Sequence, residues 1–143
     1  MKEIYTIGTS NRNLDEFIHI LKSFNIELVV DVRRFPTSKF EYFKKENLEI
    51  ALKENDIGYR YLGDLLGGFR EGGYQSYMEN EDFKRGFEQL LSLAERHRVA
   101  ILCREKFPWK CHRWLISKRL TEEGYKVIHI LDEKKTYVHK TLN

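Results

Sequence analysis

One segment constrains the fold of this chain more than any other: residues 98–123, RVAILCREKFPWKCHRWLISKRLTEE. It opens with the apolar run 99–102, which is typical of a strand buried on both faces of a sheet. A short polar loop and a helical pattern follow, so the segment predicts a strand that leads into a helix. In an open α/β sheet, ligands bind in the crevice outside the carboxyl ends of the strands, and the loop after this strand lies there.

The same order of strand and helix recurs along the rest of the chain. Further strands are predicted at residues 4–7, 28–32, 59–62 and 127–131. Asn13 and Asn80 are predicted to cap two longer helices, and Gly124 is expected to end the last one. This alternation predicts an α/β fold, a three-layer sandwich with a mainly parallel central sheet of about five strands, Rossmann-like or rhodanese-like in general architecture.

The length of 143 residues predicts a single α/β domain, residues 1–143, with a polar tail from about Asp132. A formal net charge of +3 permits an anionic ligand without requiring one. No export signal and no apolar run of roughly 20 residues occurs, so we expect a cytoplasmic protein with no membrane partner. In that reducing compartment Cys103 and Cys111 are expected to be free thiols, close enough in sequence to form a redox-responsive bond.

The second predicted strand brings Asp31 and Arg33 to a strand end. Asp31 is interpreted either as a structural residue, solvated or paired with Arg33, or as part of a binding site. Segment 37–45, TSKFEYFKK, then mixes aromatic residues with lysines. Such a mixture either stacks bases and holds phosphates, or forms a lid whose rings pack on the protein while its lysines stay in water.

A glycine-rich segment, GDLLGGFREGG at residues 63–73, follows the third predicted strand. It lacks the spacing of a dinucleotide-binding or phosphate-binding loop. We interpret it as a mobile loop over a pocket mouth, with Arg70, Tyr74 and Tyr77 as contacts, or as a plain flexible connector.

The strongest candidate site combines Cys103, Glu105, Cys111, His112 and Arg113. A thiol becomes nucleophilic as a thiolate, which a helix amino terminus or a neighbouring cation favours. The strand-end cysteine resembles the arrangement of rhodaneses and cysteine phosphatases in architecture only, because the loop here is longer and holds a carboxylate. Glu105 is interpreted as a general base, a binder of an amino or imino group, or an ion-pair partner of an arginine. His112 is interpreted as a proton shuttle or as a helix cap.

A metal site is not expected from these residues. Cys103, Cys111 and His112 include no paired cysteine knuckle, and a fourth ligand would have to come from a distant part of the chain. We therefore predict no metal and no cofactor.

Several ordered motifs resemble one protein family. They are TIGTSNRNLDEF, VVDVRRFP, LGG, YQSYM and CREKFPWKCHR. Together they resemble the bacterial and archaeal family called domain of unknown function four-eighty-eight, from about Ile4 to Ile130. The resemblance implies a compact α/β domain and no settled activity. Its motif positions fall on Gly8, Ser10, Asn11, Asp31, Arg33, Pro36, Cys103, Glu105, Cys111, His112 and Arg113. The family commonly has histidine where this sequence has Thr9.

Three functions remain open at this point. The first is a small cytosolic enzyme acting on an anionic substrate, a nucleotide or nucleic-acid fragment, with Arg33 and Arg113 holding charge and Cys103 or Glu105 reacting. The second is a non-catalytic module that binds a nucleic acid or an anionic metabolite with the loops 33–45 and 63–70. The third is a redox sensor in which the two cysteines form a bond.

Overall fold

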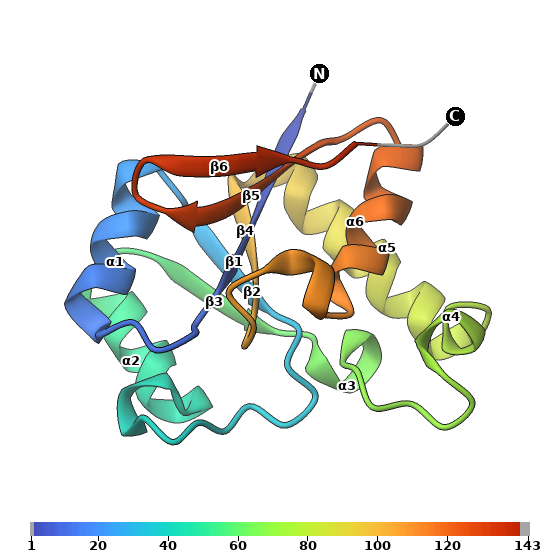
Figure 1. Ribbon diagram of the computed structural model, residues 1–143, viewed down its shortest axis with the longest axis horizontal. Helices are drawn as coiled ribbons and strands as arrows, with labels where there is room; N and C mark the ends of the chain where they lie inside the picture. Colours follow the sequence, from blue (N-terminus) through green and yellow to red (C-terminus); the bar gives the residue numbers. More distant parts are fainter. Residues whose placement is uncertain (1, 141–143) are drawn as a thin grey trace.

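The structure is a computed structural model that describes residues 2–140, and one six-stranded sheet runs through its centre (Figure 1). The strands are β1 (Glu3–Gly8), β2 (Leu28–Asp31), β3 (Gly58–Tyr61), β4 (Val99–Cys103), β5 (Lys126–Asp132) and β6 (Lys135–Val138). Their order is β3-β2-β4-β1-β5-β6, and every neighbouring pair is parallel except β5 and β6. The predicted α/β class is confirmed, and the sheet is mostly parallel.

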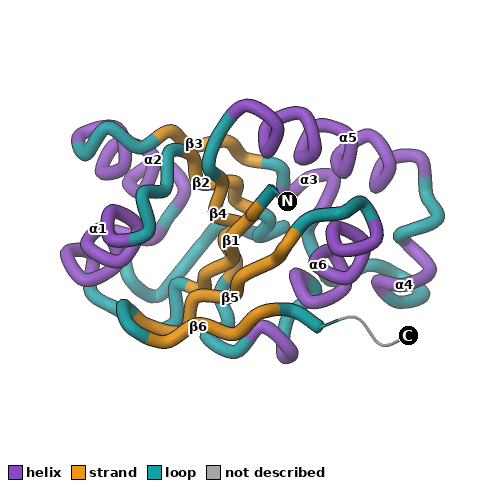
Figure 2. The backbone as a smooth tube through the Cα atoms, turned by 90° about the horizontal axis from the view of Figure 1, so that it is seen from above, coloured by secondary structure: helices purple, strands orange, loops and turns teal. Residues whose placement is uncertain are grey.

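Helices lie on both sides of this sheet (Figure 2). They are α1 (Leu14–Ser23), α2 (Lys45–Glu54), α3 (Gly63–Leu66), α4 (Tyr74–Tyr77), α5 (Glu81–Arg96) and α6 (Arg113–Glu122), with short 3-10 turns η1 (Glu41–Phe43) and η2 (Pro108–Lys110). Helices α1 and α2 lie on one side, and α5 and α6 on the other. The likeness to Rossmann-like or rhodanese-like architectures stays a prediction.

Alternation along the strands assigns each side chain to one of two hydrophobic clusters. In β4, Ala100 and Leu102 pack in the cluster that contains α1 and α2, whereas Val99, Ile101 and Cys103 pack in the cluster that contains α5 and α6. The Cys103 side chain therefore points to the same side of the sheet as α6, the helix that follows it in the chain.

The helix starts follow the predicted capping. The Asn13 side chain accepts a hydrogen bond from the Glu16 amide at 2.7 Å, and the Asn80 side chain accepts one from the Asp82 amide at 2.8 Å. Each cap satisfies an amide that has no partner within its own helix. Gly124 follows α6 with φ of 93°, a conformation that glycine adopts without strain.

Two segments differ from the prediction. Residues 135–138, placed in a polar tail, form β6 at the edge of the sheet, so the predicted number of about five strands is one short. The glycine-rich segment 63–73, interpreted as a loop, begins with α3. A β-carbon on Gly63 would lie 2.0 Å from the Arg33 carbonyl oxygen, so this glycine allows α3 to pack against the loop after β2.

The chain leaves the neighbouring strands β2 and β4 toward opposite sides of the sheet. After β2 it continues to α2, and after β4 it continues to α6 on the other side. Loops that diverge in this way leave a crevice between the two strand ends, which is where open α/β sheets bind ligands. No helix within residues 2–140 has the length and apolar character to cross a membrane.

Candidate functional site

A cavity of about 430 Å³ opens at the carboxyl ends of β2 and β4. It is lined by the loop after β2, by part of the glycine-rich segment and by the loop between β4 and α6. The predicted site residues that line it are Arg33, Tyr74, Cys103, Glu105, Cys111 and His112. The structure therefore brings together residues that lie up to 79 positions apart in the sequence, from Arg33 to His112.

Cys111 and His112 lie side by side in the wall of the cavity. The His112 Nδ1 lies 3.6 Å from the Cys111 Sγ, and its Nε2 lies 2.9 Å from the Val32 carbonyl oxygen. A carbonyl only accepts, so Nε2 carries the proton and Nδ1 of the neutral ring presents a lone pair to the sulfur. Burial lowers the pKa of His112 to about 4, and this ring is therefore neutral at pH 7.

His112 does not cap helix α6. It stands at the position before Arg113 with helical backbone angles, and its side chain makes no capping hydrogen bond. The Tyr74 ring packs 5.2 Å from the His112 ring, and the Tyr74 hydroxyl donates to the Leu66 carbonyl oxygen at 2.7 Å. Tyr74 therefore walls one side of the imidazole and fixes its plane.

The two sulfur atoms lie next to one another, paired as a disulfide across eight residues, so the expectation of free thiols is wrong for this structure. Cys103 is 1% exposed and ends β4, whereas Cys111 is partly exposed and follows η2. The Arg113 Nη1 also lies 2.6 Å from the Cys103 Sγ. A guanidinium in this position favours the thiolate form of a reduced cysteine.

Arg113 is fully buried and organises the loop after β4. Its guanidinium donates to the Glu105 carbonyl oxygen at 2.6 Å, to the Lys106 carbonyl oxygen at 3.1 Å and to the Thr6 hydroxyl at 3.1 Å. Burial, followed by the neighbouring Arg12 charge, lowers the pKa of Arg113 to about 9, so it stays charged at pH 7. The Arg113 side chain does not line the cavity, and its N–H groups donate to acceptors of the protein itself.

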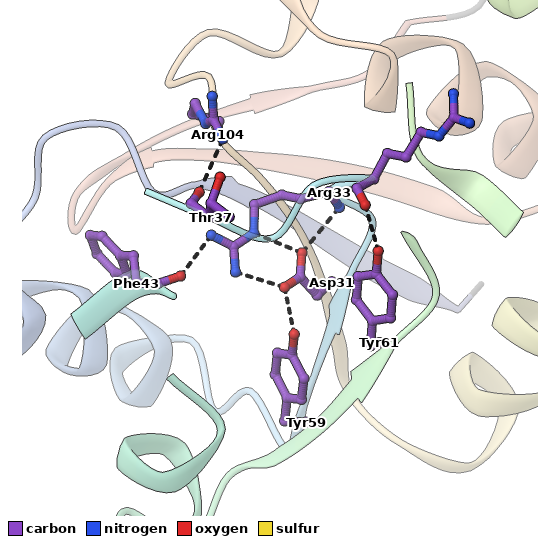
Figure 3. Close-up of polar contacts among 8 residues, drawn as sticks. Asp31, Arg33, Thr37, Phe43, Tyr59, Tyr61 and Arg104 are labelled. Carbon is purple, nitrogen blue, oxygen red and sulfur yellow. Dashed lines mark hydrogen bonds and ion pairs between the residues drawn. The ribbon is translucent and has the colours of Figure 1, made fainter. Parts of the chain in front are cut away.

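Arg33 is likewise bound within the protein (Figure 3). Its Nε and Nη2 donate to the two Asp31 carboxylate oxygens at 2.9 and 2.7 Å, and its Nη1 donates to the Phe43 carbonyl oxygen at 2.7 Å. The Tyr59 hydroxyl donates to Asp31 at 2.6 Å, and burial and the Asp31 charge raise the pKa of Tyr59. This bidentate pair is almost completely buried, so Asp31 has the structural role of neutralising Arg33.

The Glu105 carboxylate forms no ion pair with Arg33 or Arg113. Arg33 pairs with Asp31, and Arg113 binds Glu105 through its main-chain oxygen. The Glu105 side chain is exposed and lines the cavity. It is therefore available to bind a cationic group or to accept a proton from a ligand.

Three further predicted residues lie outside the cavity wall. Arg70 donates to the carbonyl oxygens of Gly67 and Asp64 at 2.9 and 2.6 Å, which holds the glycine-rich segment in place. Ser10 lines a neighbouring cavity of about 260 Å³. Asn11 is exposed next to it and accepts from the Ser10 hydroxyl at 3.4 Å.

Several residues that line the main cavity were not named individually from the sequence, although four of them lie in the two loops that the binding-module hypothesis used, 33–45 and 63–70. They are Arg34, Phe35, Thr37, Phe69, Arg104 and Lys110. The signal was present for Arg34 and Arg104, because each is the immediate neighbour of a predicted site residue at a strand end. Their guanidinium groups donate to the carbonyl oxygens of Phe69 and Thr37, at 2.5 and 3.0 Å, rather than to carboxylates. The cavity rim therefore carries positive charge that its own acids do not neutralise.

No group of three metal-ligating side chains able to hold an ion occurs within residues 2–140. The segment 37–45 packs its rings on the protein: the Phe43 ring is buried at 5.1 Å from the Phe17 ring, and the Phe40 and Tyr42 rings stack on one another at 5.5 Å.

Comparison with known proteins gives one match. Neither the curated proteins nor the solved structures contain a match to this chain. A family model described as Domain of unknown function DUF488 matches residues 13–120, a span that includes the loops after β2 and β4 and most of α6. Because this span covers most of the chain, the protein belongs to the DUF488 family, as the motifs at both strand ends predicted.

Proposed function

We propose that this protein is a small cytosolic enzyme that acts on an anionic substrate of the nucleotide or nucleic-acid class, in the cavity at the ends of β2 and β4. The observation that carries the proposal is the Cys111 and His112 pair, with Nδ1 at 3.6 Å from the sulfur and inside a cavity with cations at its rim. A nucleophile beside an oriented base is the common pattern of covalent catalysis.

The chemistry of the pair follows from the tautomer of His112. In the reduced protein, the Cys111 sulfur forms a bond to an electrophilic centre of the substrate while the bond from that centre to the leaving group breaks. His112 Nδ1 takes the thiol proton during this attack and, because burial lowers its pKa to about 4, passes the proton to the leaving group instead of keeping it. Water then hydrolyses the bond between the sulfur and the substrate and restores the thiol. Val32 keeps the ring in the required tautomer throughout, because its carbonyl oxygen binds Nε2 at 2.9 Å.

The substrate charge is assigned to Arg34, Arg104 and Lys110, which line the cavity. These three residues replace Arg33 and Arg113 in this role, because the guanidinium groups of Arg33 and Arg113 donate their hydrogen bonds within the protein. Glu105 shares the cavity with these cations and would repel a second anionic group near it. The proposal therefore expects one anionic group at the rim and a neutral or cationic group near Glu105.

The test is alkylation of the fully reduced protein by iodoacetamide, with the rate at Cys111 followed by mass spectrometry between about pH 5 and pH 9. We expect Cys111 to react faster than an ordinary thiol below its usual pKa of about 8.5, because Arg34, Arg104 and Lys110 at the cavity favour its thiolate form, and we expect inorganic phosphate to slow the reaction. Arg34→Gln and Arg104→Gln should weaken this protection, whereas Lys126→Gln, a cation 3.9 Å from Glu3 and remote from the cavity, should leave it unchanged.

Two outcomes would overturn the enzyme proposal. Alkylation at the rate of an ordinary thiol, with no protection by phosphate, removes both the nucleophile and the anion site. Nucleotide binding that survives Cys111→Ser and His112→Asn, with ordinary thiol reactivity, assigns the chain to the non-catalytic binding class instead.

A redox sensor is the second candidate, and the pairing of the two sulfurs favours it. Hydrogen peroxide would oxidise one thiolate to a sulfenic acid, and the second thiol would displace water from it to form the disulfide. The bond would occupy Cys111 and switch off the reactive pair. Peroxide treatment should therefore shift the protein on a non-reducing gel, and Cys103→Ser or Cys111→Ser should abolish the shift. A wild-type protein that keeps both thiols under mild peroxide would exclude this candidate.

A further inference from the structure

Two phenylalanine rings stand exposed at the mouth of the cavity. Phe35 comes from the loop after β2 and is 55% exposed, and Phe69 comes from the glycine-rich segment and is 81% exposed. Their ring centroids are 6.0 Å apart, with an angle of 38° between the planes. Large apolar side chains are usually buried, so a facing pair of exposed rings at a cavity mouth needs an explanation other than core packing.

The backbone at Phe69 adds a second observation. Its φ is 59°, in the left-handed region that non-glycine residues avoid. Gly67 and Gly68 stand immediately before it, so the chain places a bulky ring at the strained position rather than one of its glycines. Strain of this kind persists where surrounding structure holds it, and it concentrates at ligand-binding sites.

Arg34 contacts both segments that carry the two rings. Its Nη1 donates to the Phe69 carbonyl oxygen at 2.5 Å, and its guanidinium carbon lies 5.4 Å from the centroid of the Phe35 ring. A β-carbon on Gly67 would lie 2.4 Å from the Arg34 Cβ, so the loop that carries Phe69 is pressed directly against this arginine. One cation therefore binds the Phe69 main chain, packs on the Phe35 ring and lines the same cavity.

We propose that Phe35 and Phe69 form an aromatic clamp that stacks on both faces of a flat heterocycle, the base of a nucleotide whose phosphate binds the rim cations. The inference rests on the proposed function and names the part of the substrate that the cations do not recognise. A ring held between two others needs about 3.5 Å on each side, or about 7 Å in all. The rings are now 6.0 Å apart, so the clamp requires the two exposed side chains to rotate apart, a change that leaves the contact of Arg34 with the Phe69 main chain in place.

The neighbouring cavity extends this site along the molecule. It has a volume of about 260 Å³, shares Thr37 and Arg104 with the main cavity, and is also lined by Lys39 and Phe40. A second nucleotide unit of a strand would fit there, with Arg104 between the two units. A free nucleotide and a strand thus share the same base and phosphate chemistry, and their affinities distinguish them.

The experiment measures binding to the reduced protein by isothermal titration calorimetry, with adenosine monophosphate and ribose 5-phosphate as probes. The two share the anionic group and differ in the base. We expect the nucleotide to bind about tenfold or more tightly, because stacking on aromatic side chains is sequence-tolerant and contributes through every base. A short single-stranded oligonucleotide that binds more tightly still would identify a strand as the ligand, and equal affinity would identify a free nucleotide.

Variants separate the clamp from the anion site. Phe35→Ala and Phe69→Ala should bring the nucleotide down to the affinity of ribose 5-phosphate, whereas Phe35→Tyr and Phe69→Tyr should preserve the difference. Phe69→Gly should also lose the difference without a drop in melting temperature, because glycine adopts the left-handed φ without strain. Ile50→Ala, which truncates a 60% exposed side chain on α2, is the matched control and should bind as the wild type does.

The failure of the clamp and the failure of the proposed function give different results. If the wild type binds both probes with equal affinity, the clamp is overturned and the anion site remains. Absence of binding by either probe overturns both.

Discussion

At the scale of single residues, buried histidine and carboxylate groups set the conditions under which this protein is stable. His129 is fully buried between Thr6 and His139: its Nδ1 lies 2.6 Å from the Thr6 hydroxyl and its Nε2 lies 2.9 Å from the His139 Nδ1. Thr6 accepts from the Arg113 Nε, which leaves its hydroxyl hydrogen for His129. The neutral ring thus has a partner at each nitrogen and no place for a second proton.

The first prediction is acid sensitivity that comes from His129. Burial, followed by the Arg113 charge, lowers the pKa of His129 to about 3, whereas an unfolded histidine has a pKa of about 6.5. The unfolded chain therefore binds a proton as the pH falls below about 6.5 while the folded chain does not, and stability is lost down to about pH 3. At pH 5 this loss amounts to about 2 kcal/mol.

Urea unfolding at the two pH values measures this loss. The decrease in unfolding free energy from pH 7 to pH 5 should be smaller in His129→Gln by that amount, whereas His19→Gln, an exposed histidine beside Glu133, should behave as the wild type. An unchanged decrease in His129→Gln would refute the assignment.

The second prediction concerns the pair of Asp31 and Arg33. Asp31→Asn leaves a buried guanidinium without its counter-charge, which costs about 3–5 kcal/mol of unfolding free energy. Asp82→Asn is the matched control, because Asp82 pairs with Arg85 on the surface and such pairs contribute about 1 kcal/mol or less. Chemical denaturation of both variants checks the difference. A loss for Asp31→Asn no larger than that of the control would mean that the buried pair is not structural.

At the scale of elements, the contact between the end of β1 and the loop after β4 controls the position of the candidate site. Gly8 is the last residue of β1, and the Thr9 and Ser10 amides donate to the carbonyl oxygens of Cys103 and Arg104 at 2.9 and 2.8 Å. A β-carbon on Gly8 would lie 1.8 Å from the Glu105 carbonyl oxygen. The absence of a side chain at Gly8 is therefore what lets this loop reach Arg113.

The third prediction follows from this contact. Gly8→Ala must displace the Glu105 main chain, which breaks its hydrogen bond with Arg113, and we expect a loss of about 3 kcal/mol or more in unfolding free energy. Gly58→Ala is the control, because its nearest neighbour is the end of the Leu28 side chain at 3.0 Å, which can rotate away. Thermal unfolding measures both. The iodoacetamide rate at Cys111 should change in Gly8→Ala and stay constant in Gly58→Ala.

Elements with a buried face and a cap were predictable, whereas elements and contacts set by distant parts of the chain were not. The apolar runs of β2 and β4 and the caps Asn13 and Asn80 are local signals, and the structure has these elements where the sequence placed them. Helix α3 was missed because Gly63 at its start and Gly67 after its end are needed for close packing rather than for a loop.

The same limit applies to the candidate site. The strand ends that supply Cys103 and Arg33 were identifiable from the pattern of strands and loops. The sequence did not reveal which of the two arginines is available to a ligand. Arg33 pairs with Asp31, whereas its neighbour Arg34 lines the cavity and binds the Phe69 main chain. That choice depends on tertiary partners far away in the sequence.

At the scale of the whole molecule, the order of the strands leaves β3 at one edge of the sheet and β6 at the other. Strand β6 pairs antiparallel with β5. Its four residues are all exposed, so it contributes little to the core, and a short exposed edge strand with a lysine at its start is a feature that discourages further pairing. Tyr137 in this strand packs 6.1 Å from the Trp114 ring, which attaches β6 to α6.

The fourth prediction is that β6 prevents self-association through β5 by covering its edge. A chain ending after Glu133 exposes this edge of β5, whose Ile128 and Ile130 are buried and whose main chain then lacks a partner on the side away from β1. We expect this variant to self-associate in light scattering at concentrations where the full chain does not, and to unfold at a lower temperature. Tyr137→Ala keeps the main-chain pairing and removes only the ring contact, so it should lose some stability and stay dispersed. Association of Tyr137→Ala to the same extent would attribute the effect to the aromatic contact, and a truncated chain that stays dispersed would show that β5 is protected in another way.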